Sequence, residues 1–286
     1  MINKPLNPFQ NVVAGQKATL QIPAEALTLC KIMLDLSGTT FTKSLIDLVV
    51  IKLGARTIWQ LKGSELNSIN NYKNQADNTK KLMIDFTERD QPDFPVKEVG
   101  GLDLMTLTSV GLVTLEVTIN SGAVAPALNA FGYFEQRQGN AAILKMVPFT
   151  TSTPVAGKFS LPLQLRGALI KRLWVFYTGT NWTSSTDGNV NRVEVKKNSY
   201  VMFDQTDLQN RFTQSDNKKV PQANLYVIDF ISDNNYAAQV PTMHAATENG
   251  KSVLVYDNIE FNTWITDAGG SVINCVAEVL DAPTNL

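Results

Sequence analysis

The sequence predicts an all-β protein made of two consecutive eight-stranded jelly-roll sandwiches with short connecting helices. Strand-like segments rich in β-branched and aromatic residues alternate with turn-forming segments, about eight in each half of the chain. A pattern of strand, tight turn, strand and short helix occurs twice, once in each half. The length of 286 residues also suits two domains that each bury a core of their own.

The first copy of this pattern spans residues 46–72. Residues 48–51 are apolar and largely β-branched, which favours a strand. Gly54 follows in a turn, where a positive φ costs glycine little, and residues 57–61 form the returning strand. Ser64 is the predicted N-cap of a short helix, because its hydroxyl can accept a backbone N–H. The apolar side of that helix consists of residues at three-residue spacing: Leu66, Ile69 and Tyr72.

The second copy spans residues 191–212. It has a turn at 197–199 between two strand-like segments, and a short helix whose predicted N-cap is Thr206. Its Leu208 corresponds to Leu66 of the first helix, an offset of 142 positions (208 minus 66).

Two other pairs of landmarks share one offset. The turn residues Gly54 and Asn198 differ by 144 positions (198 minus 54). Ile84 and Ile228, which lie in similar Ile-Asp-Phe strands, also differ by 144 (228 minus 84). We interpret the chain as two diverged copies of one β-rich domain, with a small length change at the helix.

Residues 1–15 are predicted to form an extended N-terminal arm. Pro5 and Pro8 keep this stretch out of a helix, and Phe9 offers apolar surface for docking. The stretch lacks the basic, apolar and small-residue pattern of a secretory signal. The sequence leaves open whether the arm docks on its own domain or on a neighbouring subunit.

The first jelly roll is predicted over residues 16–138 and the second over residues 139–286, with the boundary in the polar stretch 136–141. Residues 102–110 fit either a strand or a short helix. Further strands are predicted at 18–22, 27–36, 80–86, 113–119, 128–135, 143–149, 158–163, 169–177, 226–230, 252–256 and 272–280.

The composition gives no sign of a nucleic-acid partner. Charged residues make up 18% of the chain and the net charge is −1, whereas nucleic-acid-binding surfaces cluster Lys and Arg. Basic residues occur in pairs such as Lys171-Arg172, a pattern typical of a solvated face. Cys30 and Cys275 lie in apolar strand-like stretches and are predicted to be two buried thiols rather than a disulfide, which suits a reducing compartment.

Catalytic motifs are missing from the sequence. The chain has one histidine, His244, and neither a nucleophile elbow nor a zinc-ligand spacing accompanies it. Asp85 and Asp229 belong to equivalent strands of different domains, so we expect them to lie too far apart for a glycosidase pair and to face solvent or an interface. The chain is therefore not expected to be an enzyme or to bind a catalytic cofactor.

Two loops carry candidate binding residues. Glu88, Asp90 and Asp93 offer the carboxylate oxygens that Ca²⁺ prefers, although their spacing matches no known calcium loop and a solvated loop is the alternative. Trp182 lies in the polar loop 178–189, where it could stack on a sugar, anchor an interface or pack locally.

The repeated pattern resembles the double jelly-roll major capsid proteins of tailless bacteriophages with an internal membrane, and the corticovirus type in particular. The order V-V-I-K-L-G, I-W-Q-L, G-S-E-L-N and later V-G-L-V-T-L-E-V is similar to that family over most of residues 9–135. The second half is similar mainly in its layout.

The resemblance implies a homotrimer whose six sandwiches form a pseudo-hexagonal capsomer, many of which tile an icosahedral shell over a lipid membrane. Its partners would be neighbouring capsomers and penton or minor capsid proteins, with no direct sequence-specific binding of nucleic acid. The protein would be synthesised and assembled in the host cytoplasm and would end in the virion capsid. Pro5, Pro8, Phe9 and Trp182 are then the candidate interaction residues, with the loop 178–189 on the outer surface.

A function of another class also fits the predicted fold. A secreted or spike-type jelly-roll module could bind carbohydrate through Trp182 and the Asn and Asp side chains near it. Such a module could act as a monomer, whereas a capsomer requires self-association.

Overall fold

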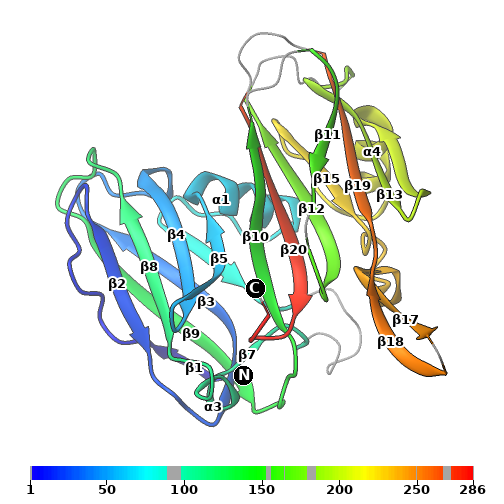
Figure 1. The fold of residues 1–286 in the computed structure, drawn as a ribbon. Coiled ribbons are helices and arrows are strands. Elements are labelled where there is room, and N and C mark those ends of the chain that lie inside the picture. The colour runs from blue at the N-terminus through cyan, green and yellow to red at the C-terminus, as the bar shows by residue number, and fades with distance from the viewer. Residues whose placement is uncertain are drawn as a thin grey trace. The chain divides into compact units, whose positions relative to one another are not determined.

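The computed structural model describes residues 2–88, 98–152, 156–163, 165–178, 185–248, 250–266 and 272–285. The chain divides into two compact units, Met1–Met146 with Leu280–Leu286, and Val147–Val279. Each unit is built mainly of β-strands (Figure 1). The sequence predicted an arm at 1–15 and jelly rolls at 16–138 and 139–286. These domain boundaries stay a prediction.

The first unit builds one sheet in the order β1-β9-β3-β6, with β7 paired to β3, and a second in the order β5-β4-β8-β2. The strands are β1 Ile2–Pro5, β2 Lys17–Ile22, β3 Leu27–Ser37, β4 Ile46–Leu53, β5 Arg56–Leu61, β6 Lys81–Asp85, β7 Leu102–Asp103, β8 Val113–Ile119 and β9 Ala127–Gln136. The helices are η1 Lys43–Leu45, α1 Gly63–Tyr72 and α3 Leu104–Leu107.

The second unit builds one sheet in the order β15-β12-β20-β10, with β16 paired to β12, and a second in the order β11-β19-β13-β14. A separate hairpin consists of β17 and β18. The strands are β10 Ile143–Ser152, β11 Gly157–Pro162, β12 Leu169–Tyr177, β13 Val190–Lys197, β14 Tyr200–Thr206, β15 Leu225–Asp229, β16 Val240–Pro241, β17 Met243–Glu248, β18 Lys251–Tyr256, β19 Ile259–Ile265 and β20 Ile273–Asp281. The helices are α4 Asp207–Asp216 and η2 Tyr236–Ala238.

Both units arrange their main strands in the same order. When the eight main strands of each unit are counted along the chain, one sheet reads first, eighth, third, sixth and the other second, seventh, fourth, fifth. This order is that of the jelly roll, in which two Greek keys form a pair of packed sheets. The predicted fold, two consecutive jelly rolls with short connecting helices, is confirmed.

The repeated pattern is β4-β5-α1 in the first unit and β13-β14-α4 in the second. The turn between the strands uses positive φ in both, at Gly54 with φ 59° and at Asn198 with φ 50°. Each hairpin also shifts register at one equivalent place, after Ile51 in the first and after Val195 in the second. The turn prediction is therefore confirmed, and the repeat extends to the backbone irregularity.

The helices keep the same offset as the strands, so the predicted change of length is wrong. Helix α1 begins at Gly63 and α4 at Asp207, 144 positions later (207 minus 63). Asn70 of α1 donates to the Met83 carbonyl at 2.9 Å, and Gln214 of α4 donates to the Val227 carbonyl at 3.3 Å. At this offset Asn70 corresponds to Gln214 and Leu66 corresponds to Asn210, so the two leucines are not equivalent residues.

The helix caps follow the prediction in the second unit only. Thr206 is the N-cap of α4, and its hydroxyl accepts from Gln209 N at 3.4 Å. In α1 the N-cap position is Lys62, whose backbone N–H donates to the Glu65 carboxylate at 2.9 Å, so the assignment of Ser64 as cap is wrong. The carboxylate of Glu65, in the first turn of α1, thus accepts a hydrogen bond from the backbone N–H of Lys62.

The N-terminal residues pair with their own unit. Strand β1 runs antiparallel to β9, with Ile2 opposite Phe134 and Pro5 opposite Phe131. The chain continues along this unit, since Leu6 N donates to the Ala130 carbonyl at 2.8 Å. The segment is extended, as its prolines require, and it supplies the first main strand of the first jelly roll.

Charged side chains are buried where the sequence suggested solvated ones. Lys171 and Arg172 are buried in β12, against the expectation for a basic pair. Asp85 and Asp229 are not in solvent either. Asp85 lies 2.9 Å from Lys31 Nζ, and Asp229 lies 2.9 Å from Arg172 Nε. Each carboxylate ends the sixth main strand of its unit and pairs with a cation on the third, so both serve the fold.

Among the described residues, no helix is long and apolar enough to cross a membrane. The longest described helices, α1 and α4, have 10 residues each. Helices α1 and α4 lie in the connection between the fifth and sixth main strands of their units.

Candidate assembly surfaces

The predicted interaction residues at the N-terminus lie along the first unit. Pro5 and Pro8 are exposed, and Phe9 is partly buried. Beside them, Lys4 forms an ion pair with Glu25, and its Nζ lies 5.0 Å from the centroid of the Phe134 ring. These contacts attach the segment to its own chain, which leaves the exposed proline faces as the surface available to a neighbour.

The acidic loop is only partly described. Glu88 is buried, and its Oε1 lies 3.7 Å from Lys73 Nζ. Asp90 and Asp93 lie outside the described residues. Within the described part of the chain, no three His, Cys, Asp or Glu side chains are grouped so that they could hold a metal ion. A structural Ca²⁺ at this loop stays a prediction.

Trp182 also lies outside the described residues, but hydrogen bonds hold the last part of its loop in place. Asp187 accepts from the Leu208 backbone N–H, and Asp207 accepts from Gly188 N, both at 2.8 Å. Burial raises the pKa of Asp207, and Arg211 lies 3.0 Å from its carboxylate. The start of α4 thus fixes the end of the loop.

The single histidine belongs to a network at the hairpin. His244 Nδ1 lies 2.8 Å from Asp257 Oδ1, and its side chain is half exposed. Burial raises the pKa of Asp257, but hydrogen bonds from Lys197, Asn198 and His244 outweigh burial and hold that pKa below its usual value. The Asp257 carboxylate therefore joins the β13-β14 turn to the β17-β18 hairpin. His244 has a structural role in this network.

Exposed apolar side chains gather on the second unit, where the sequence had indicated only Trp182. Tyr200 at the start of β14 is 73% exposed, and Phe212 on α4 is 76% exposed. Other exposed apolar residues of this unit are Leu169, Val201, Met202, Val220, Leu254, Val255, Tyr256 and Val272. The sequence signal was the run of four apolar residues from Tyr200 to Phe203, which lacks the alternation of a strand with one solvated face.

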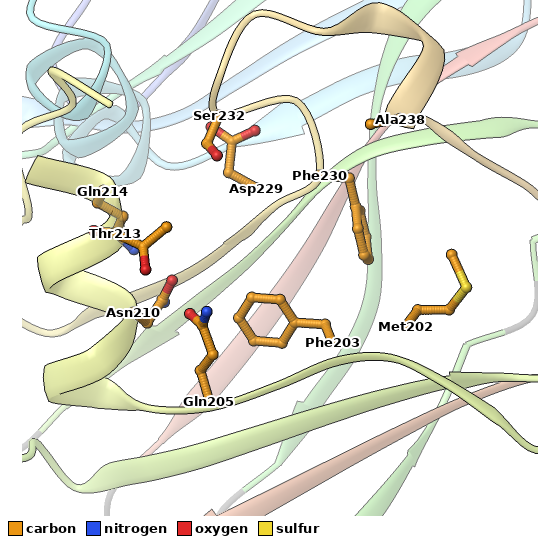
Figure 2. Close-up of a pocket in the computed structure, with 10 residues that line it drawn as sticks. All are labelled: Met202, Phe203, Gln205, Asn210, Thr213, Gln214, Asp229, Phe230, Ser232 and Ala238. Carbon is orange, nitrogen blue, oxygen red and sulfur yellow. The ribbon is translucent and has the colours of Figure 1, made fainter. Parts of the chain in front are cut away.

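A cavity of about 420 Å³ lies beside β14. Figure 2 shows Phe203 and Phe230 near one another on one side, and the polar side chains of α4 on the other. Its lining residues are Met202, Phe203, Gln205, Asn210, Thr213, Gln214, Asp229, Phe230, Ser232 and Ala238. Its size falls within the range of binding pockets.

Solved structures with low sequence identity share this fold. The major capsid protein P2 of bacteriophage PM2 aligns with a TM-score of 0.74 and 17% identity, covering 100% of both chains. A structure of Sulfolobus Turreted Icosahedral Virus aligns with a TM-score of 0.66 and 13% identity over 99% of this chain and 91% of that chain. The PBCV-1 virus capsid aligns with a TM-score of 0.58 and 13% identity over 98% and 94%.

Family models identify both halves of the sequence. Residues 3–135 match the model of the viral coat protein P2 N-terminal domain, and residues 143–283 match the model of the viral coat protein P2 C-terminal domain. A search of curated proteins found no significant match. The chain therefore belongs to the viral coat protein P2 family, and as a coat protein it is a structural component of the virion capsid and not an enzyme.

Proposed function

We propose that this chain is the major capsid protein of an icosahedral, membrane-containing tailless phage, and that it assembles as pseudo-hexagonal trimers that tile the shell. The observation that carries the proposal is the duplication of one jelly roll within one chain, at a constant offset of 144 residues (207 minus 63 for the helix starts). Three such chains bring together six sandwiches of one topology. A ring with threefold symmetry can then occupy a hexagonal position in a lattice.

The charge of the chain supports this assembly. The net charge is −1 and charged residues make up 18% of the sequence, so many identical copies can pack side by side with little mutual repulsion. Interfaces of this kind bury about 2,000 Å² or more and rely on apolar contacts. Exposed apolar residues such as Tyr200, Phe212 and Leu254 are available for them.

The remaining partners follow from the same proposal. Penton or minor capsid proteins would close the shell where the hexagonal lattice bends, and an internal lipid membrane would lie beneath it. Direct sequence-specific binding of nucleic acid is not expected, because the 25 Lys and Arg residues are balanced by 26 Asp and Glu residues and DNA binding requires an excess of positive charge. Synthesis and assembly would take place in the host cytoplasm.

Electron microscopy of the purified, assembled protein tests the proposal. The expected particle has threefold symmetry and six lobes of nearly equal size, each the size of one sandwich. Particles with two, four or five lobes, or with lobes of clearly unequal size, would contradict it.

A further inference from the structure

Strands β5 and β14 are equivalent in the two sandwiches, but one is paired beyond its sheet and the other ends its sheet. In the first, Trp59 of β5 is buried, and it is paired in parallel with Met146. In the second, the equivalent strand β14 ends its sheet and carries the exposed residues Tyr200, Val201 and Met202. An open edge strand with apolar side chains is a template for pairing with another chain.

The cavity beside β14 shows the same difference in its lining. Nine of its ten lining residues have described equivalents 144 positions earlier (202 minus 58 for the first of them), and all nine equivalents are buried. These equivalents are Ile58, Trp59, Leu61, Leu66, Ile69, Asn70, Asp85, Phe86 and Glu88. The equivalent positions of the first sandwich are therefore all buried, whereas those of the second line a cavity.

The substitutions explain why the space is hollow. Where the first sandwich has Leu66 and Ile69, the second has Asn210 and Thr213, which are smaller or more polar. Where the first has Leu61, the second has Gln205, whose buried Oε1 accepts no hydrogen bond from any described residue. A buried acceptor without a donor is costly, so the cavity suits an occupant that brings one.

We propose that the edge of β14 and its adjoining cavity are the seat of a second copy of this chain. That copy lays an extended segment along β14 and inserts a side chain with an apolar body and a hydrogen-bond donor at its tip, which reaches Gln205. The inference rests on the proposed function, because it names the surface through which the coat protein self-associates. The aromatic pair Phe203 and Phe230, with ring centroids 6.5 Å apart, borders the apolar part of the seat.

A second copy is the occupant that the structure favours over an unrelated partner. In the first sandwich, the equivalent edge is covered by backbone of this same protein, at Met146. The run from Tyr200 to Phe203 carries no charge, so no charged ligand is selected there. A coat protein also places identical chains next to one another at high local concentration, which favours contacts between copies.

A photocrosslinking amino acid, p-benzoylphenylalanine, in place of Met202 tests the contact in the full-length protein. We expect a covalent dimer in the assembled state, with the crosslinked peptide contributed by a second copy, as isotope-labelled mixtures of the protein would show. The same amino acid at Thr247, an exposed position in β17, is the control and is expected to give at most a weak crosslink. Crosslinks within one copy only, or no crosslink at Met202 in protein that has assembled, would overturn the inference.

Two variants test the energetics. Val201→Lys places a charge on the edge and is expected to raise the protein concentration needed for half-assembly by about tenfold or more, whereas Thr247→Lys leaves it unchanged. The double variant Gln205→Leu with Thr213→Ile fills the cavity as the first sandwich does. It is expected to keep or raise the melting temperature of the dissociated chain while weakening assembly, which separates loss of the seat from loss of folding.

The outcomes also separate this inference from the proposed function. If the wild-type protein fails to assemble into trimers, the proposed function fails. If the wild type forms trimers and both variants form them at the same concentration, the proposed function stands and the seat at β14 is wrong.

Discussion

Trp59 and Phe203 occupy equivalent places in the two jelly rolls, yet Trp59 is 2% exposed whereas Phe203 lines an open cavity. Each packs edge-on against a second aromatic ring. The centroids of Trp59 and Phe86 are 5.4 Å apart, and those of Phe203 and Phe230 are 6.5 Å apart. The same aromatic position thus completes a core in one unit and borders a surface cavity in the other.

This difference predicts unequal costs of truncation. Trp59→Ala removes a fully buried ring and is expected to lower the free energy of unfolding by about 3–5 kcal/mol. Phe203→Ala removes a ring that already faces a cavity, so its cost is expected to be about 1–2 kcal/mol. Urea unfolding followed by circular dichroism, at a concentration where the chain is dissociated, measures both. Equal losses would contradict the assignment of β14 as an open edge, and Val201→Ala is the exposed control.

A buried ion pair secures the C-terminal residues to the first unit. Lys145 Nζ lies 2.9 Å from Asp281 Oδ2, and both side chains are only 1% exposed. The same ammonium donates to the Ala282 and Asn285 carbonyls, at 2.7 and 2.5 Å. Burial lowers the pKa of Lys145, and the bond to Asp281 opposes that effect.

Removal of one partner of this pair leaves a buried charge without compensation. Lys145→Met is therefore expected to lower the free energy of unfolding by about 3–5 kcal/mol, and adding Asp281→Asn should recover part of the loss. Lys81→Met is the matched control. Its pair with Asp35 is 44% and 32% exposed, so it should cost at most about 1 kcal/mol. Similar losses for the two lysines in urea unfolding would refute the role of Lys145.

Acid should weaken the first unit through Asp103. Burial raises the pKa of this carboxyl, but hydrogen bonds from Thr106 and Arg137 outweigh burial, so its pKa lies below the ordinary value. A lowered pKa in the folded state means that the charged group stabilises the fold at pH values above about 4, the ordinary pKa of Asp. This stabilisation is lost as the pH falls through the folded-state pKa.

Asp103→Asn tests that contribution. The variant is expected to be less stable than the wild type by about 1–3 kcal/mol at pH 7, because it loses charge-assisted bonds to the N-terminus of α3 and to Arg137. The difference should shrink as the pH falls below about 4, the ordinary pKa of Asp, and through the lowered pKa of the folded state. A difference that stays constant over this range of pH would show that Asp103 acts by packing alone.

The two thiols should be unreactive in the folded protein. Cys30 and Cys275 are free and buried, as the sequence predicted, and burial raises the pKa of both. Because the thiolate is the reactive form, neither residue should react with Ellman's reagent at pH 8 until the chain is unfolded. Two equivalents of thiol released only in denaturant confirm this. Rapid reaction of either thiol in the native protein would contradict the burial of that residue.

Local sequence patterns predicted most of the fold, because strands and turns depend largely on residues that are close together in the sequence. The turns at Gly54 and Asn198, the β-branched strands beside them and the offset of 144 positions (198 minus 54) were all visible in the sequence. Residues 102–110 had been left open, and they form β7 followed by α3. Strand β19 was not predicted. Its buried Asn262 and Thr263 interrupt the apolar pattern on which the prediction depended.

Contacts between distant segments were beyond prediction from local patterns. Arg172 is buried because Glu278, 106 positions away in the sequence, lies 2.8 Å from its Nη1. The surface at β14 was missed for a similar reason. An open edge is recognisable only when the strand order is known, and the comparison with Trp59 needs the covering contact of Met146. Pro5, Pro8 and Phe9 were chosen for their composition, which could not show that β1 pairs with β9.

The molar mass of the purified, untagged protein in solution tests the central claim most directly. Size-exclusion chromatography with light scattering, at several concentrations and with and without Ca²⁺, should give a stable species with three times the chain mass of 31.5 kDa. An increase in trimer stability with Ca²⁺ would support a metal ion at the loop of Glu88, Asp90 and Asp93. A mass equal to one chain at all concentrations would contradict the account of two jelly rolls per chain as the building block of a capsomer.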